Sequence, residues 1–187
     1  MTGPDNDKVL ISRIARGDQL AIRSLFARYQ LRIFRFILRL VKSEAIAEEL
    51  TNEVFLEIWR NAARFEGRSS TSTWILTIAR NKALSSLRKR QEKPMDDKMA
   101  DHLRDGADSP EITTQKNDKG EIMRECLKSL SPEHAEIIDL VYYHEKTISE
   151  VSEILGIPGN TVKTRMFYAR KKLSVIMRGA GIDRGWP

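Results

Sequence analysis

The stretch TISEVSEILGIPGNTVKTRMFYARKKL, residues 147–173, contains two short helical patterns that meet at a glycine-containing break. Thr147 and Glu150 have the T-x-x-E spacing of a capping box, in which hydroxyl and carboxylate each accept a backbone N–H at a helix start. Gly156 can adopt the left-handed conformation that ends a helix, and Pro158 fits where a new helix begins. The stretch therefore predicts a helix-turn-helix.

The second of these two helices has an apolar face and a basic face. Val162, Met166, Ala169 and Leu173 recur at spacings of four, three and four, so they should face a core. The opposite face carries hydroxyls, aromatic rings and cations: Thr161, Lys163, Thr164, Arg165, Phe167, Tyr168, Arg170, Lys171 and Lys172.

This basic face has the chemistry of a DNA-binding surface. Cations pair with phosphates, while hydroxyl, Lys and Arg side chains reach base edges in the major groove. A charged helix that only faces solvent is the simpler interpretation. We expect DNA binding instead, because the basic face coincides with the turn that presents a second helix to the groove.

The composition limits the class of protein. A chain of 187 residues with net charge +6 can form one domain or two small ones, and its basic ends favour a polyanionic partner. No apolar run is long enough to cross a bilayer and the first residues lack a signal-peptide core, so we expect a cytoplasmic protein without membrane insertion. The three histidines and the single Cys126 have no spacing typical of a metal site. We predict no metal and no cofactor, and we expect Cys126 to be a small core residue.

Residues 1–41 show two helical patterns. Asp5 or Asn6 should cap a short helix that ends near Gly17, and Asp18 should cap the next helix. That next helix has a continuous apolar stripe that should be buried, formed by Ile22, Leu25, Phe26, Tyr29, Ile33, Phe36, Ile37 and Leu40. A second stripe comprises Arg28, Arg32, Arg35 and Arg39. It fits a solvated face slightly better than a contact with nucleic acid or an acidic partner.

Residues 44–63 predict a third helix whose first half is acidic, with Glu44, Glu48, Glu49, Glu53 and Glu57. Acids near a helix N-terminus interact favourably with the helix dipole. Glu53 and Glu57 lie too far along the helix for this explanation. They suggest a docking surface for a basic protein.

A Gly- and Ser-rich loop, residues 66–72, precedes a helix that ends in Arg88, Lys89 and Arg90. Helix N–H groups, hydroxyls and cations together suit phosphates and unstacked bases. Trp74 is in phase with Ile78, so we expect it to be a core anchor rather than a base-stacking residue.

The remaining segments complete a two-domain organisation. Residues 92–119 contain scattered Pro, Gly and Asp, which predicts a flexible acidic linker. Helical patterns resume over residues 120–130 and after Ser131 and Pro132, and the residues expected to pack under the helix-turn-helix are Ile137, Ile138, Val141 and Tyr142. Residues 179–187 should fray. The chain thus predicts an all-α fold with small helical domains at 1–91 and 120–178.

Three segments in this order resemble bacterial RNA polymerase sigma factors of the extracytoplasmic function (ECF) group of the sigma-70 family. They are AEELTNEVFLEIW (47–59), FEGRSSTSTWILTIARNKALSSLRKR (65–90) and ISEVSEILGIPGNTVKTRMFYARKKL (148–173). The resemblance covers nearly the whole chain. It implies sigma region 2 at residues 1–91 and sigma region 4 at residues 120–178.

The resemblance also implies partners and roles. Region 2 would bind the clamp helices of the largest subunit of core RNA polymerase through Glu49, Asn52, Glu53 and Leu56, and the flap of the second subunit would be a further contact. The residues implied at the −10 element of promoter DNA are Arg68, Ser69, Ser70, Thr71, Arg80, Asn81, Ser85 and Arg88. At the −35 element, Lys163, Thr164, Phe167 and Tyr168 would read bases, Arg165 and Arg170 would contact phosphates, and Thr161 and Lys171 lie on the same face.

The function that follows is that of an alternative sigma factor rather than an enzyme. The acidic linker would pass through the RNA exit path of polymerase, and an anti-sigma factor would cover both domains. Two other interpretations remain open. One is a sigma-like adaptor that binds an anti-sigma protein without DNA, and the other is an autonomous helix-turn-helix regulator.

Overall fold

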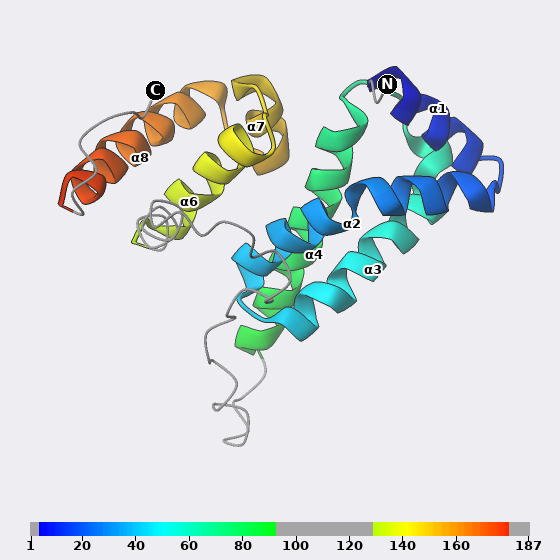
Figure 1. Cartoon of the computed structure of the whole chain (residues 1–187), viewed down its shortest axis with the longest axis horizontal. Helices are drawn as coiled ribbons and strands as arrows, with labels where there is room; N and C mark the ends of the chain where they lie inside the picture. Colours follow the sequence, from blue (N-terminus) through cyan, green and yellow to red (C-terminus); the bar gives the residue numbers. More distant parts are fainter. Residues whose placement is uncertain (1–3, 93–128, 180–187) are drawn as a thin grey trace, which may run out of the picture. The chain divides into compact units, whose positions relative to one another are not determined.

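The computed structural model describes residues 4–92 and 129–179, and the chain divides into two compact units, one containing each of these ranges. Every regular element within the two ranges is helical (Figure 1). The prediction of an all-α fold is therefore confirmed. The predicted linker, the pattern at residues 120–128, Cys126 and the tail from residue 180 lie outside the described residues.

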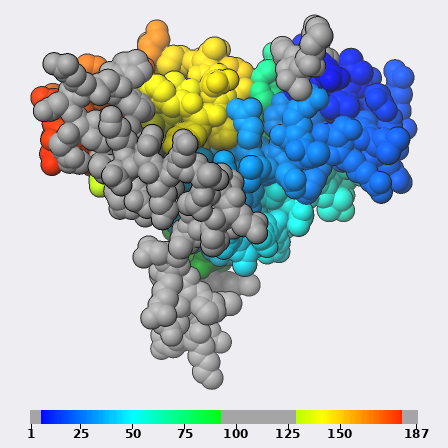
Figure 2. All heavy atoms as spheres, in the orientation of Figure 1, coloured from blue at the N-terminus to red at the C-terminus, as the bar shows by residue number. Residues whose placement is uncertain are grey.

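The first unit is a bundle formed by α1 (Pro4–Ile14), α2 (Gln19–Val41), α3 (Glu44–Asn61), the 3-10 turn η1 (Ala62–Arg64) and α4 (Thr71–Glu92). Helix α2 packs against α1, α3 and α4, and α3 also packs against α4. Figure 2 shows α1 and α2 (blue) side by side on one face of this unit. The core includes Leu25, Phe36, Ile58 and Ile75, all buried.

The start of α2 agrees with the sequence, whereas the start of α1 does not. The Asp18 side chain accepts the N–H groups of Leu20 (2.9 Å) and Ala21 (3.1 Å), as an N-cap does. Helix α1 begins already at Pro4, so the prediction that Asp5 or Asn6 caps it is wrong. Proline is suited to the first turn of a helix because its missing N–H would have no partner there.

The apolar stripe of α2 is buried at its centre. Five of its residues are buried, and the other three are half-buried: Leu25, Tyr29, Ile33, Phe36 and Ile37, then Ile22, Phe26 and Leu40. Phe26 packs against Phe55 of α3 with ring centroids 4.7 Å apart. The 3.6-residue periodicity therefore identified the correct face of this helix.

The arginine stripe of α2 is not uniformly solvated. Arg28 forms an ion pair with the buried carboxylate of Asp7 in α1, and the Tyr29 hydroxyl donates a hydrogen bond to the same carboxylate. Burial raises the pKa of the Tyr29 hydroxyl, and the hydrogen bond to Asp7 raises it further. These three side chains join α1 to α2 by polar contacts.

The second unit comprises α6 (Pro132–Ile138), the π-helical turn η4 (Asp139–Tyr143), α7 (Ile148–Leu155) and α8 (Gly159–Gly179). Ile137 and Ile138 are buried as predicted, but Val141 and Tyr142 are only half-buried. The π-helical turn explains the difference, because its wider spacing shifts side chains away from a 3.6-residue pattern. Helix α8 packs against both α6 and α7.

The helix-turn-helix prediction is confirmed in its local details. Thr147 and Glu150 form a capping box at the start of α7, and Gly156 ends that helix with a φ of 65°. Val162, Met166, Ala169 and Leu173 are all buried on the inner side of α8.

Candidate nucleic-acid interface and acidic ridge

The outer face of α8 combines exposed aromatic rings with exposed cations. Phe167 and Tyr168 are 62% and 54% exposed, and their ring centroids lie 5.5 Å apart in an edge-to-face arrangement. The other exposed residues of the predicted basic face are Lys163, Thr164, Arg170, Lys171 and Lys172, whereas Thr161 and Arg165 are half-buried. Neighbouring exposed apolar rings on a charged surface indicate a contact site.

On the outer face of α8, Arg165 and Arg170 have partners on other elements of the unit. The Arg165 guanidinium lies 3.4 Å from the Glu133 carboxylate of α6. The guanidinium of Arg170 stands 5.7 Å from the ring centroid of Tyr142 in η4. Arg165 is therefore oriented by α6 and would have to exchange Glu133 for a phosphate in order to contact DNA.

The turn between α7 and α8 is held by polar contacts. The Ser152 hydroxyl donates to the carbonyl oxygen of Ile157 at 2.6 Å, and the Ile157 N–H donates to the Ser152 carbonyl at 3.2 Å. The capping box fixes the other end of α7, where the Thr147 N–H donates to Glu150. These short local contacts hold α8 in a defined orientation relative to α7.

Hydroxyl groups organise the loop that leads into α4. The Ser70 hydroxyl accepts the Thr73 N–H at 3.3 Å and shares a hydrogen bond with the Thr73 hydroxyl at 2.8 Å. Arg68 is exposed and pairs with Glu66 at 2.5 Å, while Ser69 and Ser70 are half-buried. Thr71 is buried at the start of the helix.

All of the predicted −10 residues except Arg80 fall into two groups. Arg68, Ser69, Ser70 and Thr71 lie at the N-terminal end of α4. Asn81, Ser85 and Arg88 follow at spacings of four and three and therefore share one face further along the helix, ~15 Å or more from Thr71 at 1.5 Å per residue. Asn81 and Arg88 are exposed, while Arg80 and Ser85 are half-buried.

A hollow of about 360 Å³ lies between α1 and the loop before α4, and its lining comprises Asp7, Lys8, Gly67, Arg68, Ser69, Ser70, Thr71 and Ser72. The sequence reasoning identified the loop residues but missed Asp7 and Lys8. No local pattern connects α1 with a loop sixty residues later, so only the fold could show this proximity.

The acidic ridge is the face of α3 formed by Glu49, Asn52, Glu53 and Leu56, whose spacing puts them on one side of the helix. Glu49, Asn52 and Leu56 are exposed, and Glu53 is half-buried. Leu56 is 46% exposed, so an apolar side chain stands among acids. Lys82 of α4 contacts this ridge through its ammonium, 3.2 Å from Glu53.

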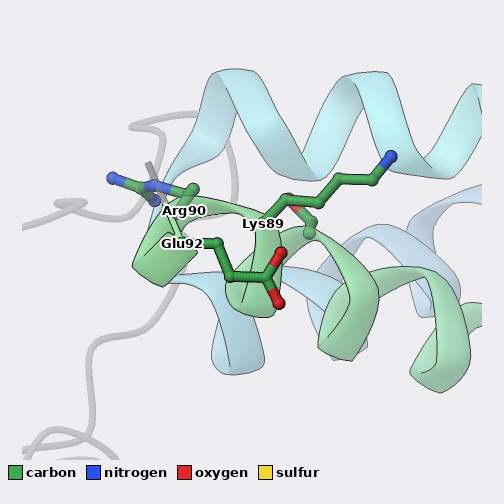
Figure 3. A pocket seen from close by; sticks show the side chains of 4 residues that line it. Lys89, Arg90 and Glu92 are labelled. Atoms are coloured by element: carbon green, nitrogen blue, oxygen red, sulfur yellow. The ribbon is translucent and has the colours of Figure 1, made fainter. Parts of the chain in front are cut away.

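A second hollow, of about 280 Å³, lies at the C-terminal end of α4 among Ser86, Lys89, Arg90 and Glu92. Figure 3 shows Lys89 and Arg90 extending in opposite directions, with the Glu92 carboxylate pointing away from Arg90. The two cations do not converge on a common point, so this surface lacks the geometry of a phosphate site.

Two compact helical units, one of which presents a basic helix after a tight turn, define a helix-turn-helix protein of the DNA-binding class. Matches to protein-family models define the class more closely. The model for sigma-70 region 2 matches residues 25–93, and that for sigma-70 region 4 matches residues 126–174.

Named relatives agree. An ECF RNA polymerase sigma factor SigK from Mycobacterium tuberculosis H37Rv is 31% identical, with 92% of this chain and 96% of the relative covered. The RNA polymerase sigma-H factor of Pseudomonas aeruginosa is 25% identical, over 92% of this chain and 94% of the relative. The chain therefore belongs to the sigma-70 family, as a sigma factor of the ECF group. Proteins of this family are transcription initiation factors that bind RNA polymerase and promoter DNA.

Solved structures share the fold. RpoE from Bartonella quintana, crystallised with the anti-sigma factor NepR, gives a TM-score of 0.70 at 23% identity and covers 87% of this chain and 98% of that protein. CnrH, in complex with the cytosolic domain of CnrY, gives a TM-score of 0.66 at 20% identity, with 92% of this chain and 97% of that protein covered. Among the described residues of this chain, no helix is both long and apolar enough to cross a membrane.

Proposed function

We propose that this chain directs core RNA polymerase to promoters through three surfaces, each of which binds a different partner or DNA element. The acidic ridge of α3 holds polymerase, the start of α4 with its loop engages the −10 element, and the outer face of α8 reads the −35 element. The observation that carries the proposal is the exposed Phe167 and Tyr168 pair, set among cations on the helix that the turn presents.

The acidic ridge fits the clamp helices of the largest polymerase subunit. Leu56 supplies an apolar contact, while Glu49 and Glu53 supply carboxylates for basic residues of the partner. A helix face that mixes an exposed leucine with acids suits a protein partner better than DNA, whose phosphates would repel it.

The loop and start of α4 support promoter opening. Extrusion of a base costs a few kcal/mol, which contacts to the unstacked base can offset. Ser69 and Ser70 offer hydroxyls, and Arg68 offers a cation for the backbone. The contact with the −35 element adds affinity through effective concentration once polymerase joins both sites.

An anti-sigma factor is a further partner supported by the relatives. The RpoE structure contains an anti-sigma factor. The fold of RpoE matches both units of this chain. A protein that covers the acidic ridge or the outer face of α8 would keep polymerase or DNA away.

This chain would act in the cytoplasm, where polymerase and promoter DNA lie.

Reconstituted transcription tests the proposal. Core polymerase of the host is combined with fragmented host DNA, with and without this chain, and RNA 5′ ends are sequenced. The chain should create a defined set of start sites. Lys163→Ala should weaken their use, whereas Arg178→Ala, the same charge change in the last turn of α8, should leave them unchanged.

Two results would overturn the proposal. If no new start sites appear, the chain does not act as a sigma factor. If a gel shift shows tight, sequence-specific binding of the chain alone to intact promoter DNA, an autonomous regulator would explain the helix-turn-helix better.

A further inference from the structure

The guanidinium of Arg170 in α8 lies over an aromatic ring of another element. It stands 5.7 Å from the ring centroid of Tyr142 in η4, inside the limit of roughly 6 Å within which the ring face attracts a cation. Arg170 is exposed, whereas Tyr142 is half-buried. The contact therefore links a cation proposed to meet DNA to a ring that packing already restrains.

The π-helical turn explains why Tyr142 stands where it does. The His144 N–H donates to the carbonyl oxygen of Asp139, five residues earlier, at 3.1 Å and so closes the wider turn. Leu140, within the same turn, is 0% exposed and anchors it in the core. Turns with this spacing are rare and frequently occur at functional sites.

The two arginines proposed to contact phosphates are held by different chemistry. Arg165 lies 3.4 Å from the carboxylate of Glu133, which is an acceptor for its N–H groups. Arg170, within the residues that the structure describes, makes no ion pair and no hydrogen bond. A ring attracts a guanidinium through its face and accepts none of the donors at the edge of the planar group. Arg170 is thus held in place while its donors remain available.

We infer that Tyr142 is a positioning residue, whose ring holds the Arg170 guanidinium in place for a phosphate of the −35 element. The inference rests on the proposed contact of the outer face of α8 with that element, to which it adds a residue of η4. Tyr142 acts through Arg170 and needs no contact with DNA of its own.

The gain in affinity comes from order that exists before DNA binds. A long side chain that becomes ordered only in the complex loses its rotamer freedom at that moment, which weakens binding. The ring restrains Arg170 in advance and does not have to be exchanged for the phosphate. We expect a gain of roughly two- to fivefold in affinity, the range that corresponds to an exposed cation–π contact.

Binding of promoter DNA by variants with altered rings tests the inference. Holoenzyme made from the full chain and core polymerase is titrated with a labelled duplex fragment of a promoter that it uses. The reference is Tyr142→Phe, which keeps the ring. Phenylalanine with increasing numbers of ring fluorines at position 142 has nearly the same shape but less electron density on its face. Affinity should fall stepwise along this series, by roughly two- to fivefold in total.

The same series in an Arg170→Ala background assigns the effect to the cation. There the fluorines should change nothing, whereas a loss of folded protein would weaken binding in both backgrounds. Arg170→Ala should also reduce the slope of log affinity against log salt by about 0.9, the value for one phosphate, and the most fluorinated ring should reduce it in part. The matched control is the same ring series at Tyr143, which is 52% exposed in the same turn and should leave affinity unchanged.

The outcomes separate the inference from the proposed function. If Arg170→Ala weakens binding but the fluorines do not, or if they act equally in both backgrounds, the inference is wrong and α8 can still contact the −35 element. Tighter binding along the series would show that the ring competes with phosphate for Arg170, which also overturns the inference. If Arg170→Ala leaves binding unchanged, the phosphate contact proposed for Arg170 fails together with the inference. A holoenzyme that binds no promoter DNA would overturn the proposed function itself.

Discussion

The ammonium of Lys82 in α4 lies 3.2 Å from the carboxylate of Glu53 and 3.7 Å from that of Glu57, both in α3. The lysine thus connects the helix proposed to engage the −10 element with the ridge proposed to hold polymerase. All three side chains are partly exposed, so each contact is weak. The effect of Lys82 on a partner that binds Glu53 can nevertheless be measured.

Replacing Lys82 by methionine should tighten binding to core polymerase. Lys82 competes with the basic partner for Glu53, and an exposed pair worth ~0.2–1 kcal/mol corresponds to a change in affinity of roughly 1.4- to fivefold. Fluorescence titration of labelled chain with core polymerase measures it. Lys89→Met removes a cation from the same helix, away from Glu53, and serves as the control. Weaker binding by Lys82→Met alone would mean that Lys82 itself supports the docking surface.

Replacing Glu133 by glutamine should strengthen DNA binding by the holoenzyme. The change releases Arg165, now 3.4 Å from Glu133, for a phosphate contact. An affinity gain of roughly two- to fivefold at low salt is expected, with a steeper dependence on salt concentration. Glu153→Gln makes the same charge change in α7 and should have a smaller effect. Equal effects of the two variants would show that only net charge matters.

Replacing Gly156 by alanine should destabilise the second unit by about 1–2 kcal/mol, the cost of the left-handed conformation for a residue with Cβ. Its φ is 65°, and an added Cβ would meet no atom within 4 Å, so backbone strain is the cause rather than a clash. Hydrogen exchange in α7 and α8 measures the loss. Gly179→Ala, at a glycine without positive φ, should cause little change, and an equal loss there would contradict this explanation.

Replacing Asp18 by asparagine should lower the stability of the first unit at neutral pH but not in strong acid. The Arg13 guanidinium hydrogen-bonds the carboxylate and, with the Ala21 N–H, lowers the pKa of Asp18 below 3.8. As pH falls, the unfolded chain takes up the proton first, so the stabilisation is complete above 3.8 and disappears through the lowered pKa. Thermal melts of both proteins across this range measure it. A difference that persists unchanged at the lowest pH would contradict the role of the charge.

Local signals predicted most of the fold. The capping box at Thr147 and Glu150, the glycine at 156 and the Asp18 cap are each written within a few residues, because caps and turns depend on nearby backbone groups. Periodicity identified the buried faces of α2 and α8. It failed at Val141 and Tyr142, where the π-helical turn breaks the period that the prediction assumed.

The candidate sites were predictable only where they follow one helix. The outer face of α8 and the acidic ridge can be read from spacing alone. The partners of Arg28 and Arg165 could not, since Asp7 lies 21 residues from Arg28 and Glu133 lies on another helix. The contribution of α1 to the lining of the hollow could not be predicted either, because it depends on packing between distant segments.

Each of the two units closes a core with its own helices. A chain arranged in this way should tolerate exchange: the segment that contains α6 to α8 could be replaced by its counterpart from a relative, and the hybrid should still load onto polymerase while starting RNA at the donor's promoters. New patterns of gene control could then arise by exchange of this segment between relatives, while the rest of the chain stays unchanged.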